Sequence, residues 1–243
     1  MIPYWMSRTE LMLGQENITS LMGKNVLIIG LGGVGGICAE MIARAGVGRM
    51  TIVDADTVEA SNRNRQLPAL VSTENKLKSE VLAERILDIN PDIKLRSVPE
   101  YLREHHTFDI LISEKYDYVV DCIDTLSPKV FLIKKSFELG LPIVSSMGAG
   151  GKVDPTQVQI GNLWKSYNCN LAYYVRKRLG QMGLKNRKLT VVWSPELADQ
   201  KRIILAPEGN PKKSLIGTIS YMPAVFGCAM ASVVIRDLMG EVG

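Results

Sequence analysis

The sequence predicts an α/β fold in which a mostly parallel sheet carries helices on both faces. Short apolar runs alternate with helical patterns between residues 25 and 147, which is typical of strand–helix–strand units joined by right-handed crossovers. The first run, from Asn25 to Gly30, is apolar at its four central positions, as expected of a strand that is covered on both faces. A glycine-rich loop follows this run directly and leads into a helical segment, which makes the predicted fold Rossmann-like.

The individual elements follow from the same two patterns. Leu77, Val81 and Leu82 recur at helical intervals, for example, and Pro91 ends that segment. We expect strands at residues 25–30, 50–54, 94–98, 118–121 and 143–147, with helices at residues 34–45, 76–90 and 127–139. A glycine-rich hinge or ligand-facing turn (148–151) then leads to strands at 158–164, 189–193 and 202–205 and helices at 171–182 and 224–239. We expect one domain (1–243), in which a Rossmann-like nucleotide-binding half (24–147) precedes a C-terminal extension of strands and helices (148–243).

Composition excludes several classes of protein. Apolar residues make up 46% of the chain and charged residues 22%, which is ordinary for a globular protein and excludes intrinsic disorder. The longest apolar stretch, residues 222–239, contains a proline, a glycine and two charged residues, so we expect no membrane association. Arg8 and Glu10 fall where a signal peptide would have its apolar segment. These features favour a cytoplasmic protein.

Cysteine and histidine are too sparse for a structural metal centre or for histidine-based catalysis. The cysteines are isolated, no C-x-x-C pair is present, and the only two histidines are adjacent in an expected loop: Cys38, Cys122, Cys169, Cys228, His105 and His106. A structural zinc site would need clustered thiolates or imidazoles. We interpret the cysteines as buried or half-buried thiols in a reducing compartment.

Charge is unevenly distributed along the chain. The net charge is +4, but residues 161–213 contain eleven Lys and Arg against three Asp and Glu, so this segment carries +8 and the remainder −4. Phosphate groups favour such a basic segment because their counterions are released on binding. The segment therefore predicts a polyanionic partner, with an ordinary solvated basic surface as the alternative.

The glycine loop has the context of a nucleotide site. Its glycines, Gly30, Gly32, Gly33 and Gly35, lie between the first strand and the first helix of this unit, where a backbone can approach phosphate at a helix N-terminus. Asp54 ends the next strand, 19 residues after Gly35, at the position of an acid that binds ribose hydroxyl groups. These features alone leave NAD and ATP open, as well as a glycine turn with a purely structural role.

Polar residues after Asp54 favour ATP. Asp56, Asn62, Arg65 and Gln66 follow the carboxyl end of that strand, and Lys78 lies in the first turn of the following helix. Ligands bind at this edge of open α/β sheets. Attack at an α-phosphorus also needs cations that neutralise developing charge, a role that suits Arg65 and Lys78.

A second set of carboxylates follows the fourth strand. Asp121 and Asp124 flank residues 122 and 123, at the same expected edge of the sheet. Mg²⁺ prefers one or two carboxylates together with phosphate oxygens and water. Asp124 is the metal candidate, whereas Asp121 either ends the strand or caps the next helix.

Taken together, these motifs resemble those of the ubiquitin-activating-enzyme-like (ThiF-type) adenylating family. The matching motifs are S-R-T-E at 7–10, G-x-G-G-x-G at 30–35, D-x-D-x-V-x-x-S-N-x-x-R-Q at 54–66, Lys78, and D-C-I-D at 121–124. The resemblance implies ATP and Mg²⁺ as cofactors and a homodimer as the working unit. By the same resemblance Asp54 would bind ribose, and Asp124 would hold Mg²⁺. Arg8 would reach the neighbouring subunit's triphosphate, and the phosphate contacts would be Asn62, Arg65, Gln66 and Lys78.

Within that family, the chain is most similar to the tRNA threonylcarbamoyladenosine dehydratase branch. The similarity rests on residues 7–11, 64–66, 148–156 and 217–223, and the two C-x-x-C pairs typical of sulfur-carrier adenylyltransferases are absent. It implies adenylation of a threonyl carboxylate on tRNA, followed by intramolecular cyclisation, which needs no protein nucleophile. The segment 161–213 would then hold tRNA phosphates.

Three alternatives compete with this interpretation. The first is an adenylyltransferase that activates the C-terminus of a small ubiquitin-like sulfur-carrier protein, with sulfur-transfer proteins as possible partners. The second is an NAD-dependent oxidoreductase, which would leave Arg65, Lys78 and Asp124 unexplained. The third is a binding module that has kept nucleotide affinity without catalysis.

Overall fold

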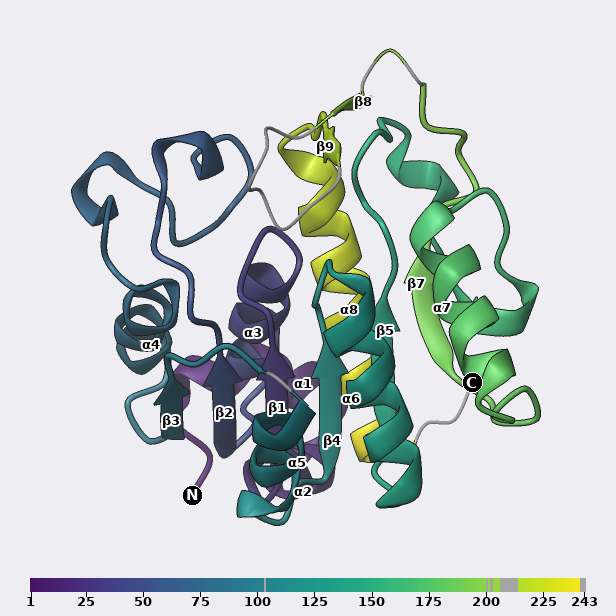
Figure 1. Ribbon diagram of the computed structural model, residues 1–243. Helices are drawn as coiled ribbons and strands as arrows, with labels where there is room; N and C mark the ends of the chain where they lie inside the picture. Colours follow the sequence, from purple (N-terminus) through teal and green to yellow (C-terminus); the bar gives the residue numbers. More distant parts are fainter. Residues whose placement is uncertain (103, 200, 202, 206–213, 241–243) are drawn as a thin grey trace.

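The computed structural model describes residues 1–102, 104–199, 201, 203–205 and 214–240. It contains a seven-stranded sheet, most of whose strands are labelled in Figure 1. The strand order is β3-β2-β1-β4-β5-β7-β6, and all pairs are parallel except β6 with β7. The strands are β1 (Asn25–Ile29), β2 (Arg49–Val53), β3 (Lys94–Val98), β4 (Tyr118–Asp121), β5 (Ile143–Ser146), β6 (Gln159–Asn162) and β7 (Thr190–Trp193). The mostly parallel sheet is therefore confirmed, and β6 and β7 continue it rather than forming a separate layer.

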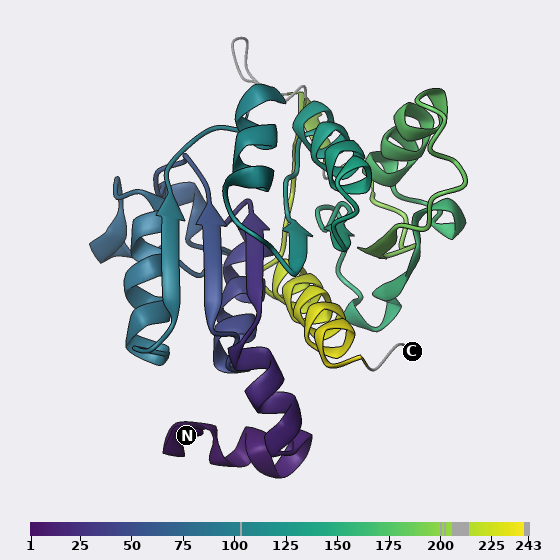
Figure 2. The same ribbon diagram turned by 90° about the horizontal axis from the view of Figure 1, so that it is seen from below.

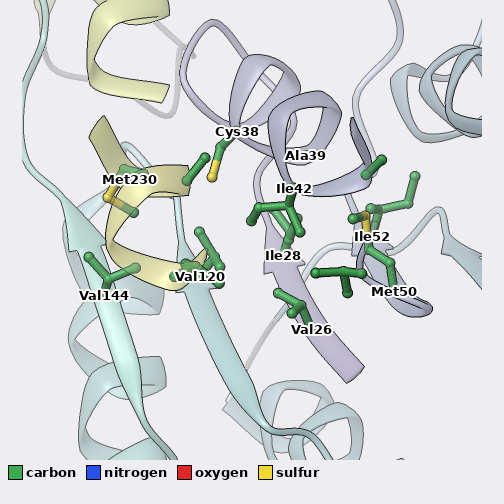
Figure 3. Close-up of a cluster of buried hydrophobic side chains, with 14 of the residues drawn as sticks. Val26, Ile28, Cys38, Ala39, Ile42, Met50, Ile52, Val120, Val144 and Met230 are labelled. Atoms are coloured by element: carbon green, nitrogen blue, oxygen red, sulfur yellow. The ribbon is translucent and has the colours of Figure 1, made fainter. Parts of the chain in front are cut away.

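Helices cover both faces of the sheet because strand side chains alternate between the faces. Val26 and Ile28 of β1 belong to one buried cluster, and Leu27 and Ile29 belong to the other. The first cluster, part of which Figure 3 shows, packs α3 (Gly35–Arg44), α4 (Lys78–Ile89) and α8 (Tyr221–Met239) on the sheet. The second packs α5 (Glu104–Ser113), α6 (Leu126–Glu138) and α7 (Asn170–Gln181) on the opposite face.

Helix α8 connects the end of the chain to the nucleotide-binding half. A Cβ added at Gly227 would lie 2.6 Å from the carbonyl oxygen of Val34, so α8 and α3 are in close backbone contact. Among the described residues, α8 is the one helix long and apolar enough to cross a membrane, but half of that segment is buried in the protein. Because α8 packs on α3 and the sheet, we describe it as a core helix.

The N-terminal residues lie at the amino edge of the sheet. They form a short 3-10 helix η1 (Tyr4–Met6), α1 (Ser7–Leu13) and α2 (Gln15–Met22), and Figure 2 shows them projecting from one side of the body. A hollow in this region is lined by Trp5 and Met6 together with Arg49, the first residue of β2. These helices were not among the elements expected from the sequence pattern.

Two further expectations need correction. The histidines at 105 and 106 lie in helix α5 and not in a loop, because Thr107, Ile110 and Leu111 bury one side of a helical turn. The expected strand at 202–205 is observed as β8 (Ile203–Leu205), but it pairs with β9 (Ser214–Ile216) in a separate two-stranded sheet. Residue 202 lies outside the described residues.

Candidate active site

The glycine loop lies between β1 and α3, and packing explains two of its glycines. Gly30 has φ +88°, and an added Cβ there would lie 2.9 Å from the carbonyl oxygen of Cys122. At Gly35 an added Cβ would lie 1.7 Å from the carbonyl oxygen of Gly30. Gly32 differs, because its nearest neighbour would be the end of the Gln66 side chain at 3.8 Å. Gly32 therefore leaves the loop backbone open to a phosphate at the start of α3.

Gln66 lies beside the glycine loop with one polar atom unpaired in the described chain. Its Oε1 atom is buried and has no hydrogen-bond partner among the described residues. An unpaired buried carbonyl is costly, at about 1–3 kcal/mol, so a partner that donates a hydrogen bond would stabilise it. The other end of the same amide, Nε2, lies 3.8 Å from a Cβ built at Gly32, and this N–H donor suits a phosphate oxygen where the nucleotide was expected.

The C-terminal segment 217–223 closes the other side of the loop. A Cβ added at Gly33 would lie 2.8 Å from Cβ of Pro223. Asn64 Nδ2 donates to the carbonyl oxygen of Thr218 over 2.9 Å. The site is thus assembled from both halves of the chain.

Asp54 connects the glycine loop to the end of β2. Its Oδ2 accepts from the backbone N–H of Leu31 at 2.6 Å, and its Oδ1 accepts from that of Asp56 at 2.8 Å. Burial raises the pKa of Asp54, although these two hydrogen bonds act in the opposite direction. Each oxygen still has lone-pair capacity for a ribose hydroxyl.

Lys78 lies at the start of α4 and reaches back to the same edge. Lys78 is only 5% exposed, and its Nζ lies 2.9 Å from Oδ2 of Asp56. Tyr101 donates to the other oxygen of Asp56 at 2.7 Å, and this bond raises the pKa of Tyr101 to about 12. Sequence reasoning missed Tyr101, which belongs to no motif and contacts the site through Asp56.

The loop after β2 carries the remaining expected phosphate contacts. Asn62 is buried, and its Oδ1 accepts from the backbone N–H of residue 59 at 3.3 Å. Arg65 donates from Nη1 to the carbonyl oxygen of Ser61 at 3.0 Å and to Oδ1 of Asn64 at 2.8 Å. Its carbonyl oxygen lies near Gly33, so Arg65 borders the glycine loop.

Asp124 follows β4 on the other side of β1 and is exposed. Within the described ranges, no group of three or more Cys, His, Asp or Glu residues could hold a metal ion. Mg²⁺ does not need such a group, because phosphate oxygens and water complete its coordination. An exposed carboxylate at this edge fits that mode of binding.

Asp121 belongs to a buried ionic cluster rather than to the exposed edge. Its Oδ2 accepts from Nζ of Lys129 at 2.6 Å and from Oγ of Ser145 at 2.5 Å. Both Asp121 and Lys129 have fully buried side chains. The other carboxylate oxygen accepts from the backbone N–H of Ile123 at 3.1 Å, which holds the turn that presents Asp124.

Arg8 lies away from the candidate site. It is exposed on α1, next to η1, whose residues border the beginning of β2. The candidate site lies at the end of β2, about 16 Å away along a five-residue strand. The structure therefore does not bring Arg8 to the candidate site of the same chain.

The basic segment is only partly oriented toward solvent. Arg176 points inward, because its Nη1 donates to the carbonyl oxygen of Ser166 at 2.7 Å. Lys177 and Arg178 are exposed. Four charged residues that contributed to the expected charge lie outside the described residues: Arg202, Glu208, Lys212 and Lys213.

The structure thus brings most of the expected site residues to one edge of the sheet. A glycine loop, a carboxylate at the end of β2, two cations and a separate carboxylate are the parts that a nucleotide-activating site needs. These features define the class as a nucleotide-dependent adenylating enzyme of the α/β type.

The chain belongs to the ThiF family, whose sequence pattern matches residues 7–242. It is 35% identical over 243 residues to the tRNA threonylcarbamoyladenosine dehydratase of Bacillus subtilis, covering 97% of this chain and 95% of that protein. The crystal structure of the Escherichia coli tRNA N6-threonylcarbamoyladenosine dehydratase in complex with ATP aligns with a TM-score of 0.84 at 31% identity, covering 96% of this chain and 93% of that one. The structure of the same enzyme with AMP aligns with a TM-score of 0.85.

Proposed function

We propose that this protein is an ATP-dependent tRNA-modifying enzyme that adenylates the threonyl carboxylate of threonylcarbamoyladenosine in tRNA and then cyclises it. The observation that carries the proposal is the convergence of Gly32, Gln66, Lys78 and Asp124 at one edge of the sheet. Nearly full-length similarity to dehydratases of this kind supports the choice of carboxylate. ATP and a tRNA substrate together favour the cytoplasm as the place of action.

The proposed reaction has two steps whose atoms balance. A carboxylate oxygen attacks the α-phosphorus of ATP, and pyrophosphate leaves. An atom of the same side chain then attacks the activated carbonyl carbon, and AMP leaves with the carboxylate oxygen that it gained. AMP thus carries away the oxygen of the water that the nucleoside loses, and the attacking atom releases a proton. The second step is fast because the nucleophile belongs to the same side chain and so has a large effective molarity.

The residue roles follow from position and charge. Lys78 and Arg65 would neutralise charge that develops on the phosphates, and Lys78 would exchange its bond to Asp56 for one to a phosphate oxygen. Asp54 would hold the ribose, while Asn62 and Gln66 would donate to phosphate oxygens. Asp124 would hold Mg²⁺, which supplies charge neutralisation when it is bound.

A homodimer would complete the site through Arg8. The proposal is supported by the distance of Arg8 from its own site and by apolar side chains nearby, where Leu11 and Met12 are each 82% exposed. Subunit mixing tests it directly. Arg8→Ala and Lys78→Ala variants should each be inactive alone, and a mixture should regain activity because one site in each mixed dimer keeps both residues. A mixture that stays inactive after exchange of subunits would contradict the arrangement.

Pyrophosphate exchange into ATP tests the adenylation step and its substrate. We expect exchange that depends on tRNA carrying threonylcarbamoyladenosine and on none of a panel of small sulfur-carrier proteins. Exchange that required a protein C-terminus would favour the first alternative instead. Binding of NAD without any ATP affinity would favour the oxidoreductase.

A further inference from the structure

Helix α7 presents an exposed face that combines two tyrosines with two cations. Tyr173 is 52% exposed and Tyr174 is 50% exposed. Lys177 and Arg178 follow each of them by four residues and are also exposed, so each tyrosine has a cation as its neighbour on the same helix surface. We refer to these four residues as the α7 face.

The α7 face is held in place from behind. Ala172, Val175 and Leu179 are fully buried on the inner side of α7. Arg176 fixes the start of the helix by donating to both the carbonyl oxygen and the side chain of Ser166. The two tyrosine rings also contact each other edge to face, with centroids 5.2 Å apart. The outward rings are therefore supported by a rigid helix.

The α7 face lies beside the candidate active site. Arg178 Nη1 donates to Oγ of Ser127 at 3.4 Å, and Ser127 is in the first turn of α6. Asp124, the expected Mg²⁺ ligand, lies three residues earlier in the chain. Tyr174 is one helical turn from Arg178, about 6 Å along the helix axis. The α7 face thus adjoins, through Arg178, the first turn of α6, which follows the edge where the α-phosphate of ATP is expected.

We propose that the α7 face binds the single-stranded part of the RNA substrate, with Tyr173 and Tyr174 stacking on unpaired bases and Lys177 and Arg178 contacting the flanking phosphates. The inference rests on the proposed function, because it names the part of the enzyme that would hold the nucleoside near ATP. The reacting carboxylate is carried by a nucleobase, and enzymes that act on a base take it out of its stack and hold it against aromatic side chains.

The chemistry of the face favours RNA over other occupants. Unpaired RNA bases are recognised by stacking on tyrosine and by nearby cations. In the part of the chain that the structure describes, neither tyrosine hydroxyl makes a hydrogen bond, so the rings are oriented by packing alone. The surrounding segment carries +8 over residues 161–213, which complements a polyanion and opposes a second copy of the same basic surface.

The stacking part is tested with paired substitutions. Tyr173→Ala/Tyr174→Ala should raise KM for the modified tRNA by at least about tenfold, since stacking contributes roughly 1–3 kcal/mol for each base. The KM for ATP should stay unchanged. Tyr173→Phe/Tyr174→Phe keeps both rings and should behave like the unsubstituted enzyme. Equal loss in the alanine and phenylalanine variants, or no loss in either, would overturn the stacking role.

The electrostatic part is tested with charge reversal and a salt titration. Lys177→Glu/Arg178→Glu should weaken tRNA binding and make the slope of affinity against salt shallower by roughly 0.7–0.9 for each phosphate that is no longer neutralised. Lys94→Glu, a reversal at the exposed first residue of β3 on the opposite edge, is the control and should change neither. The control changes the net charge by half as much as the double variant, so a control effect of about half the size or more would reduce the result to overall charge and overturn the assignment. If the unsubstituted enzyme fails to modify tRNA at all, the proposed function fails; if it works and these variants match it, only this inference fails.

Discussion

The buried pair of Lys129 and Asp121 gives the sharpest prediction about stability. Lys129 Nζ donates to Asp121 Oδ2 at 2.6 Å, to Ser145 Oγ at 3.1 Å and to the carbonyl oxygen of Ser146 at 2.9 Å. These three acceptors match the three N–H donors of an ammonium group. Replacing Lys129 with Met keeps much of the volume but leaves the Asp121 carboxylate buried without a counter-charge.

The expected cost is large because the remaining charge has no access to water. Both side chains are fully buried, and removing one member of such a pair destabilises a protein by about 3–5 kcal/mol. Lys129→Met and Asp121→Asn should each lose this amount. The double variant should lose clearly less than the sum, because it leaves no unpaired charge in the core.

Urea denaturation at fixed protein concentration measures these free energies of unfolding. Lys134→Met is a matched control, since Lys134 pairs with Glu138 at 3.6 Å on the exposed side of the same helix, and it should cost at most about 1 kcal/mol. A Lys129→Met loss below about 1 kcal/mol, or additive single losses, would refute the reasoning.

Three further predictions address the site and the sheet around it. Arg65→Ala and Lys78→Ala should each lower tRNA-dependent AMP formation by at least about 10²-fold, because each removes a positive charge that would neutralise the phosphates. The circular dichroism spectrum of each variant should be unchanged. Turnover like that of the unsubstituted enzyme would argue against both roles. Gly30→Ala should abolish ATP binding, since its Cβ would lie 2.9 Å from a backbone oxygen and the residue has φ +88°. The control Gly180→Ala in α7 places its Cβ within 4 Å of nothing and should stabilise the fold by about 0.5–1 kcal/mol. The same change in ATP affinity and in stability for both variants would contradict this reasoning. Glu40 is buried, which acts to raise its pKa, but hydrogen bonds from Arg85 and Arg44 lower it overall. The contribution of Glu40 to the free energy of unfolding should be complete above the unfolded carboxyl pKa of about 4.3 and lost as pH falls through the lower folded pKa. Glu40→Gln should therefore be less stable than the parent at pH 7 and equally stable in acid. A difference in stability that does not change with pH would be inconsistent with this linkage.

Strong periodicity made the sheet predictable from the sequence. The fourth strand was expected at residues 118–121 and is observed there, because a short apolar run bounded by turns is typical of a buried strand. The third strand was expected at residues 94–98 and is also observed there, although Lys94, Arg96 and Ser97 interrupt its apolar residues. Helix α5 was missed since its large apolar residues, Phe108, Ile110, Leu111 and Ile112, are grouped near its end and do not recur at helical intervals. The separate pairing of β8 with β9 depends on contacts between distant residues, which local patterns do not contain.

The candidate site was predictable where residues act through their own chemistry. Gly32, Asp54 and Lys78 follow from motif and strand order. Lys129 was not predictable, because a lysine is rarely fully buried and only the packing of α6 against β4 and β5 places it beside Asp121. The inward orientation of Arg176 was not predictable either, because it depends on a hydrogen bond to Ser166, which lies ten residues earlier in the chain.

Nucleoside mass analysis tests the proposed function most directly. The protein is incubated with ATP, Mg²⁺ and tRNA that carries threonylcarbamoyladenosine, and the tRNA is then digested to nucleosides. We predict that the modified nucleoside loses the mass of one water molecule and that one AMP forms for each nucleoside converted. An unchanged nucleoside mass, or AMP formation that does not depend on the tRNA, would contradict the proposed function.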